Sequence, residues 1–187
     1  MMDYFAALGI QRRPAVAESA LQRAYNQKSK LLHPDRVEGS DFSSINEAFQ
    51  VVSNPAARIQ HLLKLEFGEA GERQIGAELG GLFGTVVEVL RRVDQELNPL
   101  SGQSSPLLRA LALQSLAPLR DALDDAEKQI AERQSELQSR IAAVDQIWFQ
   151  DRAQCRKPLA QIAVDLTFVQ KWAAQVRERK VRLEELL

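Results

Sequence analysis

The sequence predicts an all-α protein. Of its 187 residues, 45% are apolar and 26% are charged, which is ordinary globular composition. Apolar residues recur at steps of three and four along most of the chain, the spacing of one helix face. Prolines and glycines interrupt these runs at intervals that separate individual helices. The chain is long enough for one sizeable helical domain or two small ones.

Two helices are expected at the start of the chain. Tyr4, Phe5 and Leu8 form a short apolar helix that Gly9 can terminate. A longer amphipathic helix is expected over residues 16–32. One residue of its apolar face is polar, a lysine whose alkyl stem can cover apolar surface. The face comprises Leu21, Ala24, Tyr25, Lys28, Leu31 and Leu32.

A proline ends this second helix. Pro34 has no backbone donor and moves His33 out of the α region, so the helix stops before it. His33 and Asp35 are then presented on a loop, where binding residues are common. Taken alone, His-Pro-Asp is typical of an ordinary helix stop. Its meaning therefore depends on the surrounding helices.

Two further helices are expected after the loop. Asp41, Ser43 and Ser44 are N-cap candidates for the first of them. Asn54-Pro55 ends that helix and starts the next, because proline suits a first helical position. The two apolar stripes are Ile45, Ala48, Phe49 and Val52, and then Ile59, Leu62, Leu63 and Leu65.

The order of these elements resembles a known family. The segment from Asp3 to Phe67 resembles a J domain. The matching stretches are Tyr4-Phe-Ala-Ala-Leu-Gly-Ile10, Ala24-Tyr25, His33-Pro34-Asp35 and Ile45-Asn-Glu-Ala-Phe49. Within that superfamily the chain is most similar to the HscB family, the J-domain co-chaperones of iron–sulfur cluster assembly. This likeness rests on the continuation through Asn54-Pro55 to Arg58-Ile-Gln-His-Leu62-Leu63.

The resemblance implies a chaperone partner and a binding site. J domains dock on the nucleotide-binding domain of a DnaK-type chaperone and stimulate its ATP hydrolysis. The implied chaperone-binding residues are His33, Pro34, Asp35, Arg23, Lys28, Lys30 and Arg36. Residues 1–36 carry six basic and three acidic side chains, in a chain of net charge −1, and such a charge excess favours encounter with an acidic surface. Asn26 and Gln27 replace residues that are basic in many J domains, which favours a dedicated HscA-type chaperone over a general one.

Residues 69–187 predict a second domain. Apolar stripes indicate helices over 74–98, 106–154 and 158–187, separated at Asn98-Pro99 and Lys157-Pro158. Their spacing and short connections favour an elongated antiparallel three-helix bundle projecting from the J domain of residues 1–68.

Glycines and one proline weaken this helical pattern. Gly76, Gly80, Gly81 and Gly84 each cost about 1 kcal/mol relative to alanine in a helix interior. The first bundle helix is therefore expected to fray, to start late or to use its glycines for close packing. Pro118 implies that the second helix begins near it or kinks there.

The resemblance also implies a client site on the bundle. In HscB-like proteins the bundle binds the scaffold protein for cluster assembly, and a phenylalanine of the last helix belongs to the binding face. Phe168 matches that residue, although it also fits a core aromatic. The first bundle helix of the family carries an apolar and acidic patch that this chain lacks, and Leu82, Phe83 and Glu88 are candidate substitutes that do not align with it.

Composition disfavours enzymatic and nucleic-acid functions. Cys155 is the only cysteine, so neither an intramolecular disulfide nor a cysteine-based zinc site is possible. His33, His61 and the carboxylates show no metal-ligand spacing, and no phosphate-binding loop is present. The pI of 6.2 disfavours nucleic-acid binding. We expect no cofactor and no metal, and, without a signal sequence or an apolar run of membrane-spanning length, a cytoplasmic protein that does not contact membranes.

Two functions fit these observations. The first is a non-enzymatic J-domain co-chaperone that stimulates a DnaK/HscA-type ATPase and delivers a client, the iron–sulfur cluster scaffold protein. The second is a non-catalytic adaptor or structural coiled-coil protein with a vestigial J-like domain. The sequence leaves the oligomeric state open.

Overall fold

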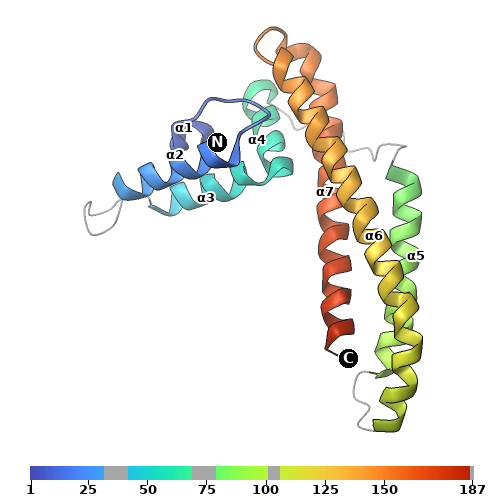
Figure 1. The fold of residues 1–187 in the computed structure, drawn as a ribbon. Coiled ribbons are helices and arrows are strands. Elements are labelled where there is room, and N and C mark those ends of the chain that lie inside the picture. The colour runs from blue at the N-terminus through green and yellow to red at the C-terminus, as the bar shows by residue number, and fades with distance from the viewer. Residues whose placement is uncertain (32–41, 69–78, 101–105, 186–187) are drawn as a thin grey trace. The chain divides into compact units, whose positions relative to one another are not determined.

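The computed structural model describes residues 1–31, 42–68, 79–100 and 106–185, without the side chains of residues 100 and 106–115. All regular structure in these ranges is helical, which confirms the all-α class (Figure 1). The helices are α1 (Tyr4–Leu8), α2 (Glu18–Leu31), α3 (Phe42–Ser53), α4 (Pro55–Phe67), α5 (Leu79–Leu97), the 3-10 helix η1 (Asn98–Leu100), α6 (Pro106–Ile147) and α7 (Arg152–Glu184).

The chain divides into two compact units. Unit 1 comprises residues 1–74 and 138–166, and unit 2 comprises residues 75–137 and 167–187. The division falls within α6 and α7, so each of these helices contributes to both units. The end of the α6–α7 hairpin thus belongs to the same unit as the N-terminal helices. The expected assignment of residues 1–68 to one functional domain and of 69–187 to another stays a prediction.

Local signals set the bounds of α1. The side chain of Asp3 caps its start by accepting hydrogen bonds from the amides of Phe5 at 3.0 Å and Ala6 at 3.2 Å. Gly9 ends it with a φ of 70°, a conformation that glycine adopts without strain. The predicted role of Gly9 as the terminator of this helix is confirmed.

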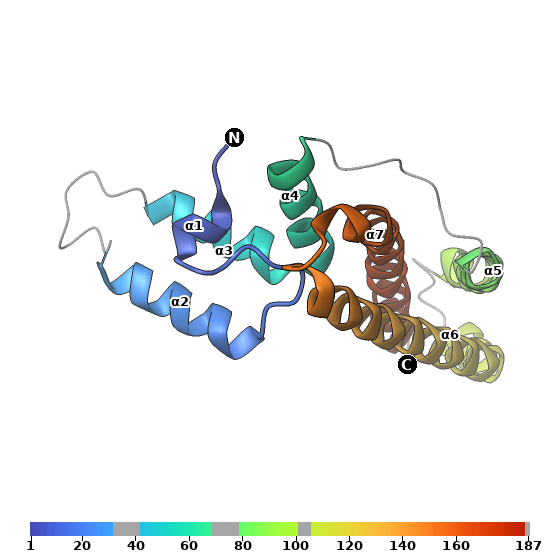
Figure 2. The same cartoon turned by 90° about the horizontal axis from the view of Figure 1, so that it is seen from above.

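The helices α2 and α3 lie side by side, with α1 packed against both (Figure 2). The Tyr25 hydroxyl donates to Asn46 Oδ1 at 2.7 Å, and the rings of Tyr25 and Phe49 are 4.4 Å apart. Asn54 then caps α4 by accepting from the amides of Ala56 and Ala57, with Pro55 in the first turn as predicted. The buried apolar residues of these four helices are Phe5, Leu8, Leu21, Ile45, Ala48, Val52, Ala56, Ile59, Leu62 and Leu63.

The end of the α6–α7 hairpin completes unit 1. Trp148 is fully buried, and its Nε1 donates to the carbonyl of Arg12 at 3.0 Å. Its ring meets that of Phe67 edge-on at 6.4 Å. The buried carboxylate of Asp145 accepts from both Arg13 and the amide of Ala15, the latter at 3.0 Å. These contacts hold the segment between α1 and α2 against α6.

In unit 2, α5 and parts of α6 and α7 pack through the predicted stripes. Arg179 of α7 pairs with Asp94 of α5 at 3.0 Å. Lys180 pairs with Asp124 and Glu127 of α6, each at 2.6 Å. The buried apolar residues are Leu79, Val86, Leu90, Val93 and Leu97 of α5, Leu116, Leu119, Leu123, Ala126, Ile130 and Leu137 of α6, and Val169, Trp172, Val176 and Leu183 of α7.

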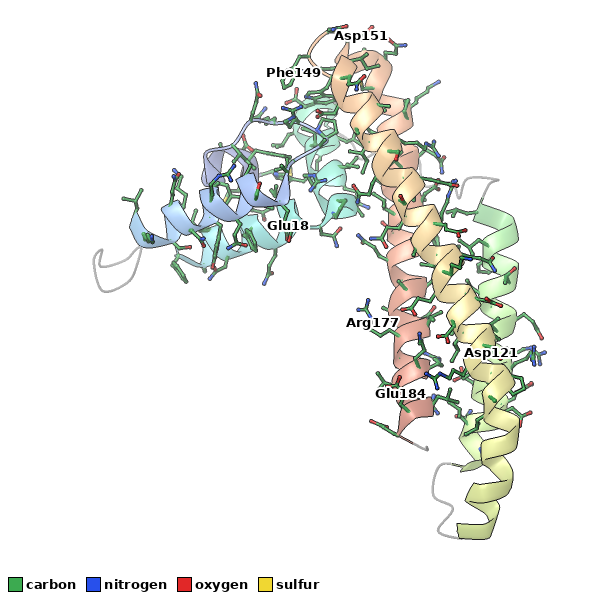
Figure 3. The ribbon with its side chains drawn as sticks, in the orientation of Figure 1. Glu18, Asp121, Phe149, Asp151, Arg177 and Glu184 are labelled. Atoms are coloured by element: carbon green, nitrogen blue, oxygen red, sulfur yellow. The ribbon has the colours of Figure 1, made fainter. Side chains whose placement is uncertain are left out.

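The predicted break at Lys157-Pro158 is wrong. The helix α6 ends at Ile147, and α7 begins at Arg152 with Pro158 inside it. Figure 3 shows Phe149 and Asp151 at the turn between the two helices. The reason is a local cap: Asp151 Oδ1 accepts from the amide of Gln154 at 3.0 Å and starts the helix six residues early.

Pro118 and the glycines near the start of α5 can be compared with the expectations from the sequence. Pro118 does not start α6, which runs from Pro106 through it. The structure describes α5 from Leu79 onward, so the expected start of this helix at residues 74–78 lies outside the described residues. A Cβ added at Gly80, Gly81 or Gly84 would meet nothing within 4 Å. These three glycines therefore do not serve close packing in the part of the chain that the structure describes, whereas Gly76 lies outside it.

Candidate functional site

The His-Pro-Asp motif connects α2 to α3. Its residues His33, Pro34 and Asp35, together with Arg36, lie outside the described residues, which resume at Phe42. The motif follows the last turn of α2 in the sequence, and that turn ends at Leu31, an apolar side chain that is 65% exposed.

The described part of the predicted chaperone-binding surface is the basic side of α2. Arg23 and Lys30 are exposed and Lys28 is half-buried. None of the three forms an ion pair with any residue that the structure describes. Lys28 and Lys30 lie in the last turn of α2, where cations also complement the helix dipole. This end of α2 thus offers positive charge that is not neutralised by the described residues.

Lys28 has a second, structural contact. A Cβ added at Gly9 would lie 3.3 Å from Lys28 Cε, so the alkyl stem of this lysine covers the C-terminus of α1. This contact explains why a lysine occupies the otherwise apolar face of α2. The Nζ of Lys28 would also lie only 3.7 Å from that Cβ, so we assign this half-buried lysine to the basic surface only in part.

His61 is a packed histidine. Its Nε2 accepts a hydrogen bond from the amide of Tyr4 at 3.1 Å, and its ring stacks on the Tyr4 ring at 4.5 Å. Burial lowers the pKa of His61 from its ordinary value. The neutral ring therefore holds α1 against α4 and does not belong to the basic surface.

The residues predicted for the client site fall into two groups. The rings of Phe83 of α5 and Phe168 of α7 both contact the ring of Trp172, with centroids 5.9 Å and 6.0 Å from it. Phe83 is 47% exposed, whereas Phe168 is half-buried. We call Phe83, Phe168 and Trp172 the aromatic cluster. Two predicted residues are therefore brought together by a third that the sequence did not single out.

Leu82 and Glu88 lie outside the aromatic cluster. Leu82 is half-buried, and exposed Glu88 pairs with Arg91 at 2.7 Å on the same helix. Val87, one turn after Phe83, is 43% exposed and extends the apolar surface of α5. The sequence analysis did not name Val87 and Trp172. Each lies four residues after a predicted residue, Phe83 or Phe168, and this spacing places it on the same helix face.

The described residues offer neither a metal-ion site nor a membrane-spanning helix. Among the described residues, no three histidine, cysteine, aspartate or glutamate side chains are grouped so that they could hold a metal ion. Cys155 is buried, and burial raises the pKa of its thiol. No helix in the described ranges has the length and apolar character needed to cross a membrane.

Comparison with known proteins matches the N-terminal part to one family. The DnaJ domain model matches residues 3–61. The Co-chaperone protein HscB of Proteus mirabilis is 33% identical over 75 residues, which are 35% of this chain and 43% of that protein. The Chaperone protein DnaJ of Thermosynechococcus vestitus is 37% identical over 79 residues, 40% of this chain and 20% of that protein. The chain thus spans less than half the length of these relatives.

Solved structures resemble the fold of nearly the whole chain. Human co-chaperone HscB aligns with a TM-score of 0.58 at 19% identity and covers 97% of this chain and 83% of that one. HscB from Vibrio cholerae aligns with a TM-score of 0.58 at 18% identity and covers 97% and 99%. The fold likeness therefore includes the C-terminal helices. The chain therefore matches the DnaJ domain over residues 3–61, is similar in sequence to HscB co-chaperones in its N-terminal part, and shares the fold of HscB structures over nearly its whole length.

Proposed function

We propose that this protein is a co-chaperone that stimulates the ATPase of a DnaK/HscA-type chaperone. The observation that carries the proposal is the DnaJ domain match over residues 3–61, which includes His33-Pro34-Asp35 directly after the basic end of α2. The cations of α2 would steer an acidic chaperone surface into contact, and the motif would make the contacts that accelerate hydrolysis.

The helices around the motif support this role. Tyr25 fixes α2 to α3 through its hydrogen bond to Asn46 and its ring contact with Phe49. Tyr25 makes both contacts and lies less than two turns before Leu31, the last residue of α2. A firmly held helix end reduces the conformational entropy that the partner must overcome on docking.

The first prediction concerns His33. In single-turnover assays with the purified DnaK/HscA-type chaperone of the same organism, we expect the wild-type protein to accelerate hydrolysis of bound ATP. We expect the His33→Gln variant to lose this acceleration while keeping the thermal stability of the wild type. A rate that the wild-type protein leaves unchanged would contradict the proposal and favour the adaptor function.

Charge-reversed variants test the basic surface in the same assay. Arg23→Glu combined with Lys30→Glu should lower the apparent association rate by roughly tenfold or more at low salt, because like charges would then face the chaperone. Lys128→Glu combined with Lys157→Glu, at exposed residues of α6 and α7, changes the net charge equally, is the matched control and should have little effect. Equal effects of the two sets would indicate a response to net charge alone.

We further propose that the aromatic cluster binds the client, an iron–sulfur cluster scaffold protein. The resemblance to the HscB family is what suggests this class of client. The surface itself supports a protein partner: Phe83 and Val87 are large, exposed and apolar, and aromatic side chains are enriched at the centres of interfaces. The Glu88–Arg91 pair would lie at the polar edge of such an interface.

The second prediction concerns these side chains. Phe83→Ala and Phe168→Ala should each weaken binding of the purified scaffold protein, by roughly tenfold or more for Phe83 because truncation of a central interface aromatic often costs more than 1 kcal/mol. Isothermal titration calorimetry measures the change. Val181→Ala is the control, since Val181 is 48% exposed on α7 and lies nine residues after Trp172 in the sequence. Equal losses in all three variants would contradict the assignment.

A further inference from the structure

An open cleft lies in unit 1 between the N-terminal segment and α6. It has a volume of about 640 Å³, within the range of pockets that hold small organic molecules. Its apolar wall consists of alanine, valine and isoleucine side chains. The residues of that wall are Ile10, Ala15, Val16, Ala17, Ala20, Ile141 and Ala142.

The polar groups of the cleft wall are cationic or neutral. Arg13, Arg58, Gln11 and Gln138 line it, and no carboxylate does so among the described residues. The nearby carboxylate of Asp145 already accepts from Arg13 and from the amide of Ala15. The wall therefore combines two guanidinium groups with two amides that can donate hydrogen bonds.

Arg58 is the most unusual of these groups because only 5% of it is exposed. Its Nε donates to the carbonyl of Pro14 and its Nη1 to that of Val52, both at 2.9 Å. Both acceptors are uncharged. No described residue forms an ion pair with this guanidinium, and its Nη2 has no hydrogen-bond partner in the described ranges. The negative charge of Asp145 acts on this guanidinium without contacting it directly, and burial still dominates, since it lowers the pKa of Arg58 to about 10. A buried cation with no direct anionic partner is costly, and here it borders a cleft.

The start of α2 adds positive potential to the same wall. The carbonyl of Ala17 accepts from the amide of Leu21, so Ala17 occupies the N-cap position. An alanine side chain cannot cap the first amides of a helix. No capping side chain satisfies these amides, and one acidic side chain, Glu18, lies in the first turn and offsets part of the positive charge of this helix end.

We propose that this cleft binds a small organic anion with an apolar body. Its carboxylate would face the Nη2 of Arg58, and its apolar part would lie against Val16, Ala20 and Ile141. Arg13 is paired with Asp145 and contributes little net charge. The proposal concerns a surface other than the basic side of α2 and the aromatic cluster, and it does not depend on either proposed function.

A pair of probes tests the charge requirement on the full chain. 1-Naphthoate and the neutral 1-naphthamide have the same ring and differ in the carboxylate. In NMR titrations of ¹⁵N-labelled protein, naphthoate should shift the amides of residues 15–20 and the Nε–H of Arg58 in a saturable manner. We expect it to bind roughly tenfold or more tightly than naphthamide, since a charge-assisted hydrogen bond contributes at least that factor. Equal affinities, or no saturable shift, would overturn the proposal.

Two neighbouring substitutions test the location. Ala142 lines the cleft and Ala143 does not, although both are exposed on α6. Ala142→Trp should fill the cleft and abolish the naphthoate shifts, whereas Ala143→Trp should leave them unchanged. Loss in both variants, or in neither, would overturn the assignment to this cleft. If thermal melting shows that Ala142→Trp is unfolded, the comparison of the two probes on the wild-type protein decides the matter by itself.

Discussion

Four polar or charged side chains are buried among the described residues: Arg58, His61, Asp145 and Asp165. Three of them connect segments that are distant in sequence. Burial lowers the pKa of Arg58 to about 10, so this group remains charged at neutral pH. Asp145 is linked to Arg13 across 132 positions. At the scale of single residues, unit 1 is therefore held by polar contacts as well as by its apolar core.

His61 gives a prediction about pH. Because burial lowers its pKa below the ordinary value, the unfolded chain binds more protons at this site than the folded chain does as the pH falls through about 6.5. The free energy of unfolding should therefore decrease between pH 7 and pH 5. Protonation would also remove the acceptor for the amide of Tyr4. Urea unfolding followed by circular dichroism at several pH values measures this effect.

The two histidines of the chain supply the control for this measurement. His61→Gln keeps a neutral acceptor but cannot titrate, so the decrease below pH 7 should be smaller than in the wild type. His33→Gln should retain it in full. An unaltered pH profile in His61→Gln would show that another group causes the effect.

At the scale of helices, the sequence predicted ends that depend on local signals. Gly9 and Asn54-Pro55 act on their immediate neighbours, and the structure places these helix ends where they were expected. The predicted start of α7 was wrong because a proline such as Pro158 is a strong helix-ending signal in the sequence, whereas Asp151 is a single capping residue. A helix can accommodate an exposed internal proline, at about 3 kcal/mol, when a cap and the burial of a residue such as Trp148 fix its start elsewhere.

The glycines of α5 give a prediction at the same scale. Gly84→Ala should raise the free energy of unfolding by about 1 kcal/mol, because the new Cβ meets open space and alanine favours the helix. Gly9→Ala should lower it by about 1–2 kcal/mol, since Gly9 has a positive φ and its Cβ would crowd Lys28. Urea unfolding measures both changes. A loss of stability in Gly84→Ala would contradict this prediction, because it would show that another residue packs closely against position 84.

The functional residues were predictable to different degrees. The His-Pro-Asp motif was identified from short-range sequence because three consecutive residues and the adjacent helices define it. Phe83 and Phe168 were named by resemblance, but their common contact with Trp172 arises from the packing of α5 on α7. Arg58 looked like part of an ordinary helix, and only the fold shows that it borders a cleft. Contacts between distant segments have no periodic signal in the sequence.

At the scale of the whole molecule, the proposed chaperone-binding surface and the proposed client-binding surface belong to different compact units. The basic side of α2 is in unit 1, and the aromatic cluster is in unit 2. The helices α6 and α7 contribute residues to both. Since each surface is built from its own set of contacts, substitutions in one should not disturb the other, and effects of distant substitutions are expected to be additive.

The most direct test of the co-chaperone account measures ATP hydrolysis by the chaperone and binding of the scaffold protein in parallel, for the wild type, His33→Gln and Phe83→Ala. We predict that His33→Gln loses stimulation of hydrolysis but binds the scaffold protein normally. Phe83→Ala should stimulate hydrolysis normally in the absence of client but bind the scaffold protein weakly. A His33→Gln variant that stimulates hydrolysis as well as the wild type would contradict the central claim.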